Sequence, residues 1–89
     1  MPRKERVTRV IDGDTFETAS RKHPVRLAGV DTPEKREPGY GEAKRALERA
    51  ILGQEVVIDT KARDKHGRSV ADVRVGRESV NKMMKQYKK

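Results

Sequence analysis

The chain has 89 residues, the length of one small domain, and we expect a single folded unit over residues 1–89. Only 33% of the residues are hydrophobic and 3% are aromatic, and there is no cysteine, which excludes disulfides and thiolate metal sites. Lys and Arg outnumber Asp and Glu by 22 to 14, and the formal charge of +8 favours a polyanionic partner.

The sequence also bears on location. It holds no run of 18 apolar residues, so we predict neither a membrane span nor a membrane partner. The N-terminal MPRKER is positively charged but has no apolar segment behind it, unlike a signal peptide. We expect a cytoplasmic protein by default, or a secreted one if the chain is a processed form. We also expect a monomer, with a homodimer as the alternative.

Three strands are predicted in the first third of the chain. They alternate and are rich in β-branched residues, and they are separated by polar or glycine-containing turns. The predicted strands are residues 7–11, 15–18 and 25–30. A loop with two prolines and alternating charges follows at residues 31–39.

The periodicity then changes to that of a helix. Residues 41–52 repeat apolar side chains at three and four positions, and Gly53 suits a helix C-terminus. Strands are predicted at residues 55–60 and 69–75, around a charged loop, and Ser79 can cap a short last helix. The order βββαββα is that of an OB-fold, a five-stranded barrel with helices in the α+β class.

Four acids follow the predicted strands. Asp12 and Asp14 flank a glycine at one strand end, and Asp31 and Glu34 follow the third strand. If the first three strands are neighbours, these acids converge, and converging carboxylates repel one another unless a cation lies between them. Oxygen ligands with few histidines favour Ca²⁺ or Mg²⁺ over zinc. The alternative is ordinary turn chemistry, because D-G-D and D-T-P both form good turns.

Two arginines accompany the acids. Arg26 lies within the third predicted strand, where a half-buried guanidinium needs an anionic partner. Arg68 ends the loop D-K-H-G-R. Guanidinium groups are suited to binding phosphate. The alternatives are a salt bridge from Arg26 to Asp31 or Glu34, and plain solvation of Arg68.

Together these groups suit phosphodiester hydrolysis. A hard divalent ion orients a phosphate oxygen, a carboxylate that does not bind the metal accepts a proton from water, and the arginines stabilise developing charge. The basic surface attracts the polyanionic substrate.

Four blocks of sequence carry a resemblance to a known family. V-T-R-V-I-D-G-D-T, V-R-L-A-G-V-D-T-P-E, Y-G-E-A and D-K-H-G-R, in this order, resemble the staphylococcal nuclease (thermonuclease-like) family over nearly the whole chain. The resemblance implies an OB-fold, Ca²⁺-dependent nuclease that acts on DNA and RNA and leaves 3′-phosphate ends. Single strands are the expected preference, and Mg²⁺ is the less favoured metal.

The resemblance also implies roles for individual residues. Asp14 and Asp31 resemble the carboxylate ligands of calcium, and Thr32 resembles the residue that offers it a backbone carbonyl. Glu34 resembles the residue assigned as general base, a role debated within the family. Arg26 and Arg68 resemble the phosphate-binding arginines, and Asp12 resembles an accessory acid.

The chain departs from the family pattern in three ways. His66 stands where better-known members carry Tyr, and it could bind phosphate or simply be a solvated loop histidine. The loop after Glu34 is short. The chain ends at Lys89 without the family's last helix and its base-pocket tyrosines, which implies weaker substrate affinity and stability.

Two other functions compete with a nuclease. A nucleic-acid-binding OB module with little or no catalysis would share the basic charge but would not need the five residues Arg26, Asp14, Asp31, Glu34 and Arg68 together. A protein-interaction domain would be expected to have lost the acids.

Overall fold

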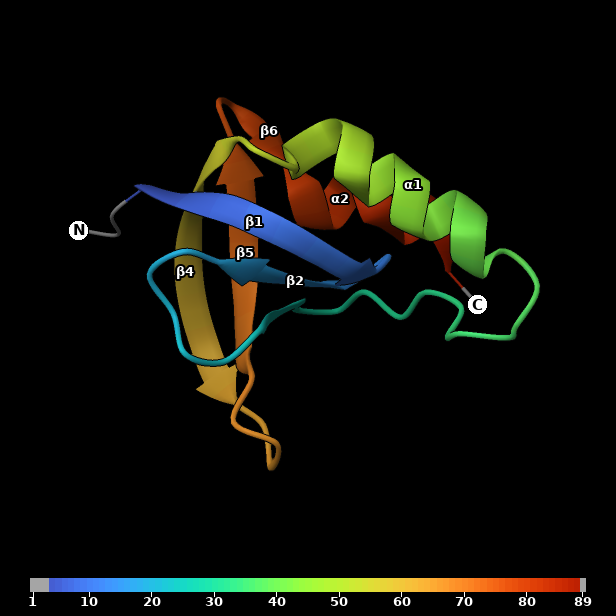
Figure 1. Cartoon of the computed structure of the whole chain (residues 1–89), viewed down its shortest axis with the longest axis horizontal. Coiled ribbons are helices and arrows are strands. Elements are labelled where there is room, and N and C mark those ends of the chain that lie inside the picture. The colour runs from blue at the N-terminus through green and yellow to red at the C-terminus, as the bar shows by residue number, and fades with distance from the viewer. Residues whose placement is uncertain (1–3, 89) are drawn as a thin grey trace.

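Six strands, two α-helices and a 3₁₀ turn make up most of residues 4–88, the part of the chain that the computed structural model describes (Figure 1). In chain order they are β1 (Lys4–Asp12), β2 (Thr15–Thr18), β3 (Val25–Leu27), α1 (Tyr40–Ile51), β4 (Glu55–Arg63), β5 (Ser69–Val75), β6 (Glu78–Ser79), α2 (Val80–Met84) and η1 (Lys85–Tyr87).

Five of the strands close into a barrel. The sheet order is β3-β2-β1-β4-β5-β6, and β3 also pairs with β5. This last pairing is parallel, whereas every other pairing in the sheet is antiparallel. Because β3 contacts both β2 and β5, the first five strands form a closed ring, which removes most bare edges. The predicted OB-type, five-stranded barrel is confirmed, and β6 is a two-residue addition at its margin.

The third strand is shorter than predicted. It ends at Leu27 rather than at residue 30, because Gly29 has a φ of +72°, a left-handed conformation that turns the chain out of the strand. Beyond this turn Val30 is only 2% exposed. The turn thus redirects Val30 into the core, breaking the alternation that the strand prediction assumed.

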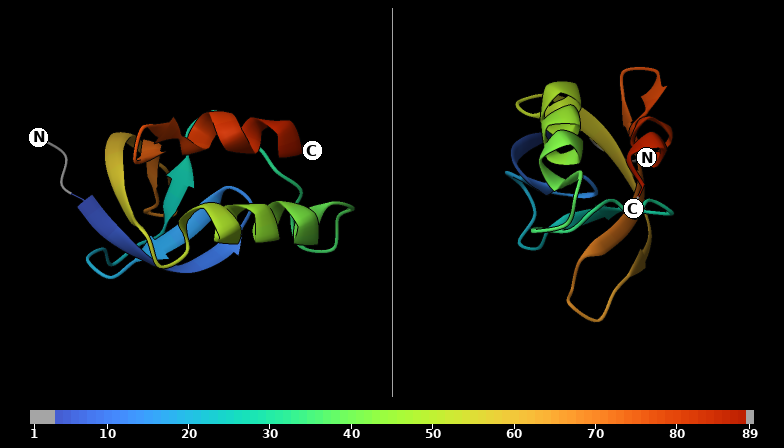
Figure 2. Two further views of the ribbon diagram at one scale, coloured as in Figure 1. Left: turned by 90° about the horizontal axis from the view of Figure 1, so that it is seen from above. Right: turned by 90° about the vertical axis from the view of Figure 1, so that its right-hand side faces the viewer.

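The helices lie together against one side of the barrel, and the β4–β5 hairpin protrudes away from them (Figure 2). The predicted apolar face of α1 is buried at Ala43, Ala46, Leu47 and Ile51. Ser79 caps α2 by accepting a hydrogen bond from the Lys82 amide at 3.2 Å. Val80 and Met84 of α2 are buried in the same core, so this helix covers the barrel. Neither helix is long and apolar enough to cross a membrane.

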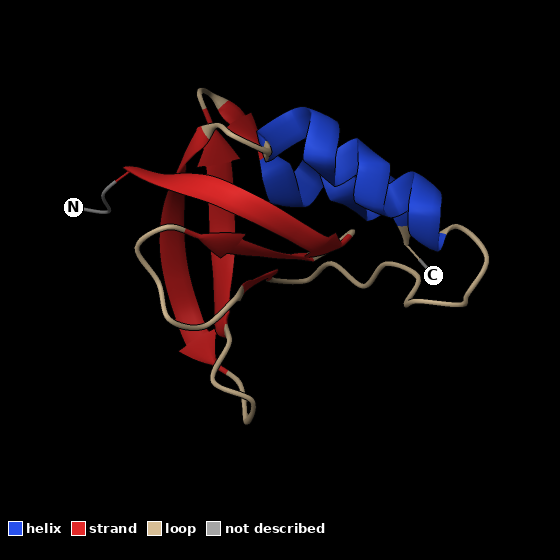
Figure 3. Cartoon of the chain, in the orientation of Figure 1, coloured by secondary structure: helices blue, strands red, loops and turns tan. Residues whose placement is uncertain are grey.

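One buried amide connects α2 to the strand that precedes the long loop. The Asn81 Oδ1 accepts a hydrogen bond from the Val73 amide at 2.8 Å. Its Nδ2 donates to the carbonyls of Ala28 at 2.9 Å and Ala71 at 3.1 Å. Asn81 thereby fixes the end of β3, from which the longest loop of the molecule begins (Figure 3).

Candidate active site

Asp14, in the turn between β1 and β2, is the centre of a cluster of acids and arginine. Its side chain is held by three donors from three parts of the chain. Oδ1 accepts from the Thr15 hydroxyl at 2.8 Å, and Oδ2 accepts from the Thr32 amide at 3.2 Å and from Arg26 Nη2 at 3.4 Å. Only 6% of Asp14 is exposed. The carboxylate is therefore fixed in orientation before any ligand binds.

Gly13 allows this turn to lie against α1 and the loop after β3. A Cβ at position 13 would stand 2.7 Å from both the Ala43 Cβ and the Thr32 Oγ1. These distances are shorter than van der Waals contact, so any larger residue would push the turn away from Thr32, whose amide holds Asp14. The sequence explains Gly13 as a turn residue, but in the structure close packing requires it.

Arg26 brings together acids from two separate strand ends. Its Nη2 lies 3.4 Å from Asp14 Oδ2 and 3.7 Å from Asp31 Oδ1. The Arg26 side chain is 24% exposed, and that of Asp31 is 70% exposed. The salt bridge to Asp31, given above as the alternative for Arg26, is thus present, whereas Glu34 forms no ion pair within residues 4–88.

Proximity to one another shifts the pKa values of Asp12 and Asp14 in opposite directions. Burial, followed by the hydrogen bond to Asp14 and the repulsion of its charge, raises the pKa of Asp12 to about 6. Burial also acts to raise the pKa of Asp14. The hydrogen bonds from Asp12, Thr15 and Thr32 and the charge of Arg26 outweigh it, so the pKa of Asp14 lies below its ordinary value. Of the two acids, Asp14 is therefore the one that keeps its charge when the pH falls below about 6.

Arg68 directly precedes β5, the strand that pairs with the strand of Arg26. In the parallel β3–β5 register, Arg26 is opposite Val70 and buried Val25 is opposite buried Ser69. Because side chains alternate along a strand, Arg26 and Arg68 face the same way, out of the barrel.

Asp64 holds Arg68 in place within the hairpin. Its Oδ1 accepts from the amides of His66 and Arg68, both at 2.9 Å, and its Oδ2 accepts from Arg68 Nε at 2.6 Å. No hydrogen bond to other residues in the described chain is recorded for the terminal nitrogens of Arg68. They are therefore available for a ligand.

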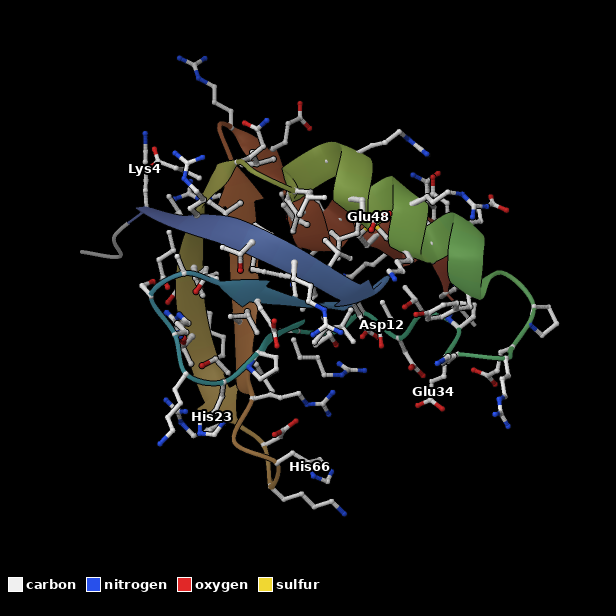
Figure 4. All side chains as sticks on the ribbon, in the orientation of Figure 1. Lys4, Asp12, His23, Glu34, Glu48 and His66 are labelled. Carbon is white, nitrogen blue, oxygen red and sulfur yellow. The ribbon has the colours of Figure 1, made fainter. Side chains whose placement is uncertain are left out.

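The side chains of Glu34 and His66 form no hydrogen bond or ion pair with the cluster within residues 4–88. Glu34 is exposed on the loop between β3 and α1, and its amide donates to Glu37 Oε1 at 2.7 Å. His66 is exposed at the tip of the β4–β5 hairpin, while Asp12 lies at the end of β1 (Figure 4). Of the predicted site residues, hydrogen bonds and ion pairs join Asp12, Asp14, Asp31, Thr32 and Arg26. Arg68 directly precedes the strand that pairs with that of Arg26. Within residues 4–88, Glu34 and His66 form no side-chain hydrogen bond or ion pair with these residues.

Three residues that support the site were not singled out from the sequence. Thr15 orients Asp14, Asp64 orients Arg68, and the Tyr40 hydroxyl donates to the Ile11 carbonyl at 3.0 Å. The Tyr40 bond anchors the start of α1 to the end of β1. The separation of four residues between Asp64 and Arg68 was a signal for their ion pair, whereas the Tyr40 contact depends on the fold.

The donor chemistry fits a hard cation, although residues 4–88 contain no preassembled group of three or more acids, histidines or cysteines that could hold a metal ion. The candidate donors are all oxygen, which suits Ca²⁺ or Mg²⁺. The Thr32 Oγ1 is buried with no hydrogen-bond partner among the described atoms. The site thus contains an oxygen atom, Thr32 Oγ1, without a hydrogen-bond partner among the described atoms, close to the ionised carboxylate of Asp14.

The fold and the site together define a small OB-type barrel with an acid–arginine cluster at one end. Residues 24–87 match the sequence model of the family described as "Staphylococcal nuclease homologue". The chain is 36% identical over 89 residues to the thermonuclease of Staphylococcus hyicus, covering 89% of this chain and 53% of that protein. It is 39% identical over 85 residues to the thermonuclease of Staphylococcus intermedius, covering 84% of this chain and 51% of that one.

A further relative is Protein ParB of Escherichia coli, 37% identical over 78 residues, an alignment that covers 85% of this chain and 44% of ParB. The chain belongs to the staphylococcal nuclease homologue family, as its four sequence blocks predicted. It spans about half the length of the curated relatives that it matches.

Proposed function

We propose that this protein is a metal-dependent nuclease that hydrolyses phosphodiester bonds of DNA or RNA and leaves 3′-phosphate ends. The observation that carries the proposal is the position of Arg26. It is shared between Asp14 and Asp31, and Arg68 directly precedes β5, the strand that pairs with the strand of Arg26. Two relatives named thermonucleases support the same reaction.

Arg26 and Arg68 would bind the phosphate. Arg68 can offer its two terminal nitrogens as a fork, while Asp64 fixes Nε. Arg26 would exchange part of its contact with Asp14 and Asp31 for a phosphate oxygen. Both arginines would then stabilise negative charge that gathers on the phosphate oxygens as the bond breaks.

Asp14, Asp31 and the Thr32 carbonyl would hold Ca²⁺, with Mg²⁺ as the less favoured ion. When bound, the ion supplies charge neutralisation and orients a phosphate oxygen. Asp14 suits this role because its donors keep it ionised and fixed, and Asp31 suits it because its exposed carboxylate is free to turn. Asp12, at the edge of the same cluster, would act as an accessory acid.

Glu34 would accept a proton from the attacking water. An acceptor must be ionised and accessible, and Glu34 is exposed with no ion pair recorded within the described chain. His66, at the hairpin tip, would add a polar contact to the bound strand. A single strand is the expected substrate.

The test is a cleavage assay on single-stranded DNA and RNA with Ca²⁺, with Mg²⁺ and with a chelator, followed by end-group analysis. We expect cleavage that needs metal and leaves 3′-phosphates. Replacing Asp14 by Ala, Arg26 by Ala or Glu34 by Gln should each lower the rate by about 100-fold or more.

Arg9→Ala and Glu48→Gln are matched controls, because each removes one charge outside the acid–arginine cluster. Full activity with chelator, or unchanged rates in all three site variants, would refute the proposal. Metal-independent binding without cleavage would instead establish the barrel as a nucleic-acid-binding module.

A further inference from the structure

A second basic pocket lies on the other side of the β4–β5 hairpin from Arg68. Arg63 is paired with Ser69, whose side chain faces into the barrel, and the backbone of Asp64 is paired with that of Arg68. Since neighbouring residues on a strand point to opposite faces, Arg63 and Arg68 lie on opposite sides of the same hairpin. The pocket, of about 210 Å³, is lined by Arg21, Lys22, His23, Arg63 and Ser69, and we call it the hairpin pocket.

The hairpin pocket is built from two loops that contact one another. The Ser69 amide donates to the Pro24 carbonyl at 3.1 Å. A Cβ built at Gly67 would lie 3.4 Å from the ring of His23, so the imidazole packs against the hairpin backbone. Figure 4 shows His23 and the hairpin residue His66 at the same end of the molecule. The β2–β3 loop and the hairpin therefore form one surface.

The cations of this pocket differ in how they are neutralised. Arg21 is fully engaged: it binds the Glu5 carboxylate at 2.7 and 2.9 Å and donates to the Ser69 hydroxyl at 3.0 Å. Lys22 and Arg63 have no carboxylate within ion-pair distance among residues 4–88. Arg63 is nevertheless oriented, because its Nη1 donates to the Gly67 carbonyl at 3.1 Å.

These features describe an anion site. Among residues 4–88, no acid lines the pocket, and Lys22 and Arg63 have no ion-pair partner. The Ser69 hydroxyl accepts from Arg21 and so keeps its own proton to donate. The Gly67 carbonyl that holds Arg63 belongs to the residue directly before Arg68. The pocket therefore begins one residue from the proposed phosphate arginine.

We propose that the hairpin pocket binds a second phosphate of the same single-stranded nucleic acid, flanking the phosphate held by Arg26 and Arg68. The inference rests on the proposed function for the identity of the ligand. A strand that crosses the hairpin at Gly67 contacts Arg68 on one side and Arg63 and Lys22 on the other. Affinity should therefore rise when the strand is long enough to reach both sides.

The test measures binding of fluorescent oligothymidylates of two to eight nucleotides by anisotropy, with chelator present so that nothing is cleaved. We expect the wild-type affinity to increase with length, and the increase to be lost in the double variant Lys22→Ala, Arg63→Ala. Each lost phosphate contact should lower the salt slope of log K by about 0.7, which is on the order of 5-fold in affinity at 0.1 M salt. Binding of the two-nucleotide probe should stay unchanged.

The matched control is Arg49→Ala, Arg77→Ala. It removes the same charge from exposed positions at the end of α1 and in the β5–β6 turn. Unfolding curves verify that both double variants fold. If both double variants lose the length-dependent affinity equally, the effect is one of net charge only. If the pocket variant keeps the length-dependent affinity, the pocket binds no phosphate. Either result overturns the proposal.

The outcome separates this inference from the proposed function. A wild-type chain that shows the length-dependent binding and its loss, yet cleaves nothing with Ca²⁺ or Mg²⁺, refutes the nuclease and supports the pocket. A chain that cleaves but shows no length-dependent affinity refutes the pocket alone. A chain that binds no oligonucleotide at low salt overturns the pocket whatever the cleavage assay shows.

Discussion

Asp14 owes its orientation to neighbours that approach it from β2, β3 and the long loop. The Thr15 hydroxyl, the Thr32 amide and the Arg26 guanidinium each donate to it. Each of these bonds to a charged group contributes more than a bond between neutral groups. Gly13 allows the Thr32 amide to reach Asp14, and Asp64 orients the guanidinium of Arg68.

Gly13→Ala should lower the free energy of unfolding by about 1–3 kcal/mol, because the new methyl group overlaps Ala43 and Thr32. Urea unfolding measures the change. Gly41→Ala is the matched control, since its methyl group would meet only the mobile end of Arg45 and alanine is the better helix former. We expect Gly41→Ala to be neutral or stabilising, and equal losses in the two variants would contradict the packing argument.

Asp64→Asn should weaken phosphate binding through Arg68. The amide oxygen can still accept from the His66 and Arg68 amides, so the loop is kept, but the NH₂ group cannot accept from Arg68 Nε. We expect a several-fold rise in KM for an oligonucleotide with little change in stability. The same substitution in an Arg68→Ala background should then have no further effect. A tighter-binding Asp64→Asn variant would show instead that Asp64 competes with the phosphate.

At the scale of the elements, Arg21 connects the β2–β3 loop to three strands of the barrel. Arg21 reaches Glu5 on β1, Thr60 on β4 and Ser69 on β5. The guanidinium thus joins three strands at the end where the hairpin protrudes. It does so with a compensating carboxylate, which a partly buried cation needs.

Glu5 should make stability depend on pH. The hydrogen bond from Arg21 lowers the pKa of Glu5 below its ordinary value of 4.5, against the opposing effect of burial. Because the folded-state pKa is depressed, the stabilisation is present above about pH 4.5 and is lost as the pH falls through the folded-state value. Wild type should exceed Glu5→Gln in unfolding free energy at pH 7, and the difference should shrink at pH 3.

Chemical denaturation at the two pH values checks this. Glu17→Gln is the control, because Glu17 forms only an exposed 3.8 Å pair with Arg9, and it should change stability by less than about 0.5 kcal/mol. A wild-type advantage over Glu5→Gln that stays constant between pH 7 and pH 3 would contradict the role assigned to the Arg21–Glu5 pair.

At the scale of the whole molecule, holding the carboxyl groups of Asp12 and Asp14 close together lowers the stability of the folded barrel. Asp12 and Asp14 repel each other, and Arg26 alone bridges Asp14 and Asp31. A cation that binds only the folded state would relieve this repulsion and raise the stability of the whole chain.

Calcium should therefore raise the melting temperature of the intact protein. At a concentration one hundred times Kd, the gain is about 2.7 kcal/mol, on the order of 10 °C for a domain of this size. Asp14→Asn should remove the calcium-dependent increase, and Asp59→Asn, which changes an exposed acid on β4, should retain it. An equal increase in both variants would mean that calcium acts elsewhere.

The fold was largely predictable from local pattern. Alternating apolar residues predicted the strand at residues 69–75, and the helical period predicted α1. Both elements were confirmed, because each pattern reflects which side chains face the core. The end of β3 was not, because the left-handed Gly29 turns Val30 into the core, although alternation from Val25 would put Val30 on the outer face. Local pattern also could not decide that Asp31, and not Glu34, forms the ion pair with Arg26.

The sequence by itself determined the order of the elements, the basic charge, the family and the acids and arginines available for a site, because these follow from periodicity and residue type. The tertiary structure alone decided which of those groups meet. Closure of β3 onto β5 brings the strand of Arg26 against the strand that Arg68 precedes, and Gly13 lets Thr32 reach Asp14. Such contacts depend on strand register and on packing between segments distant in the chain, which no local pattern encodes.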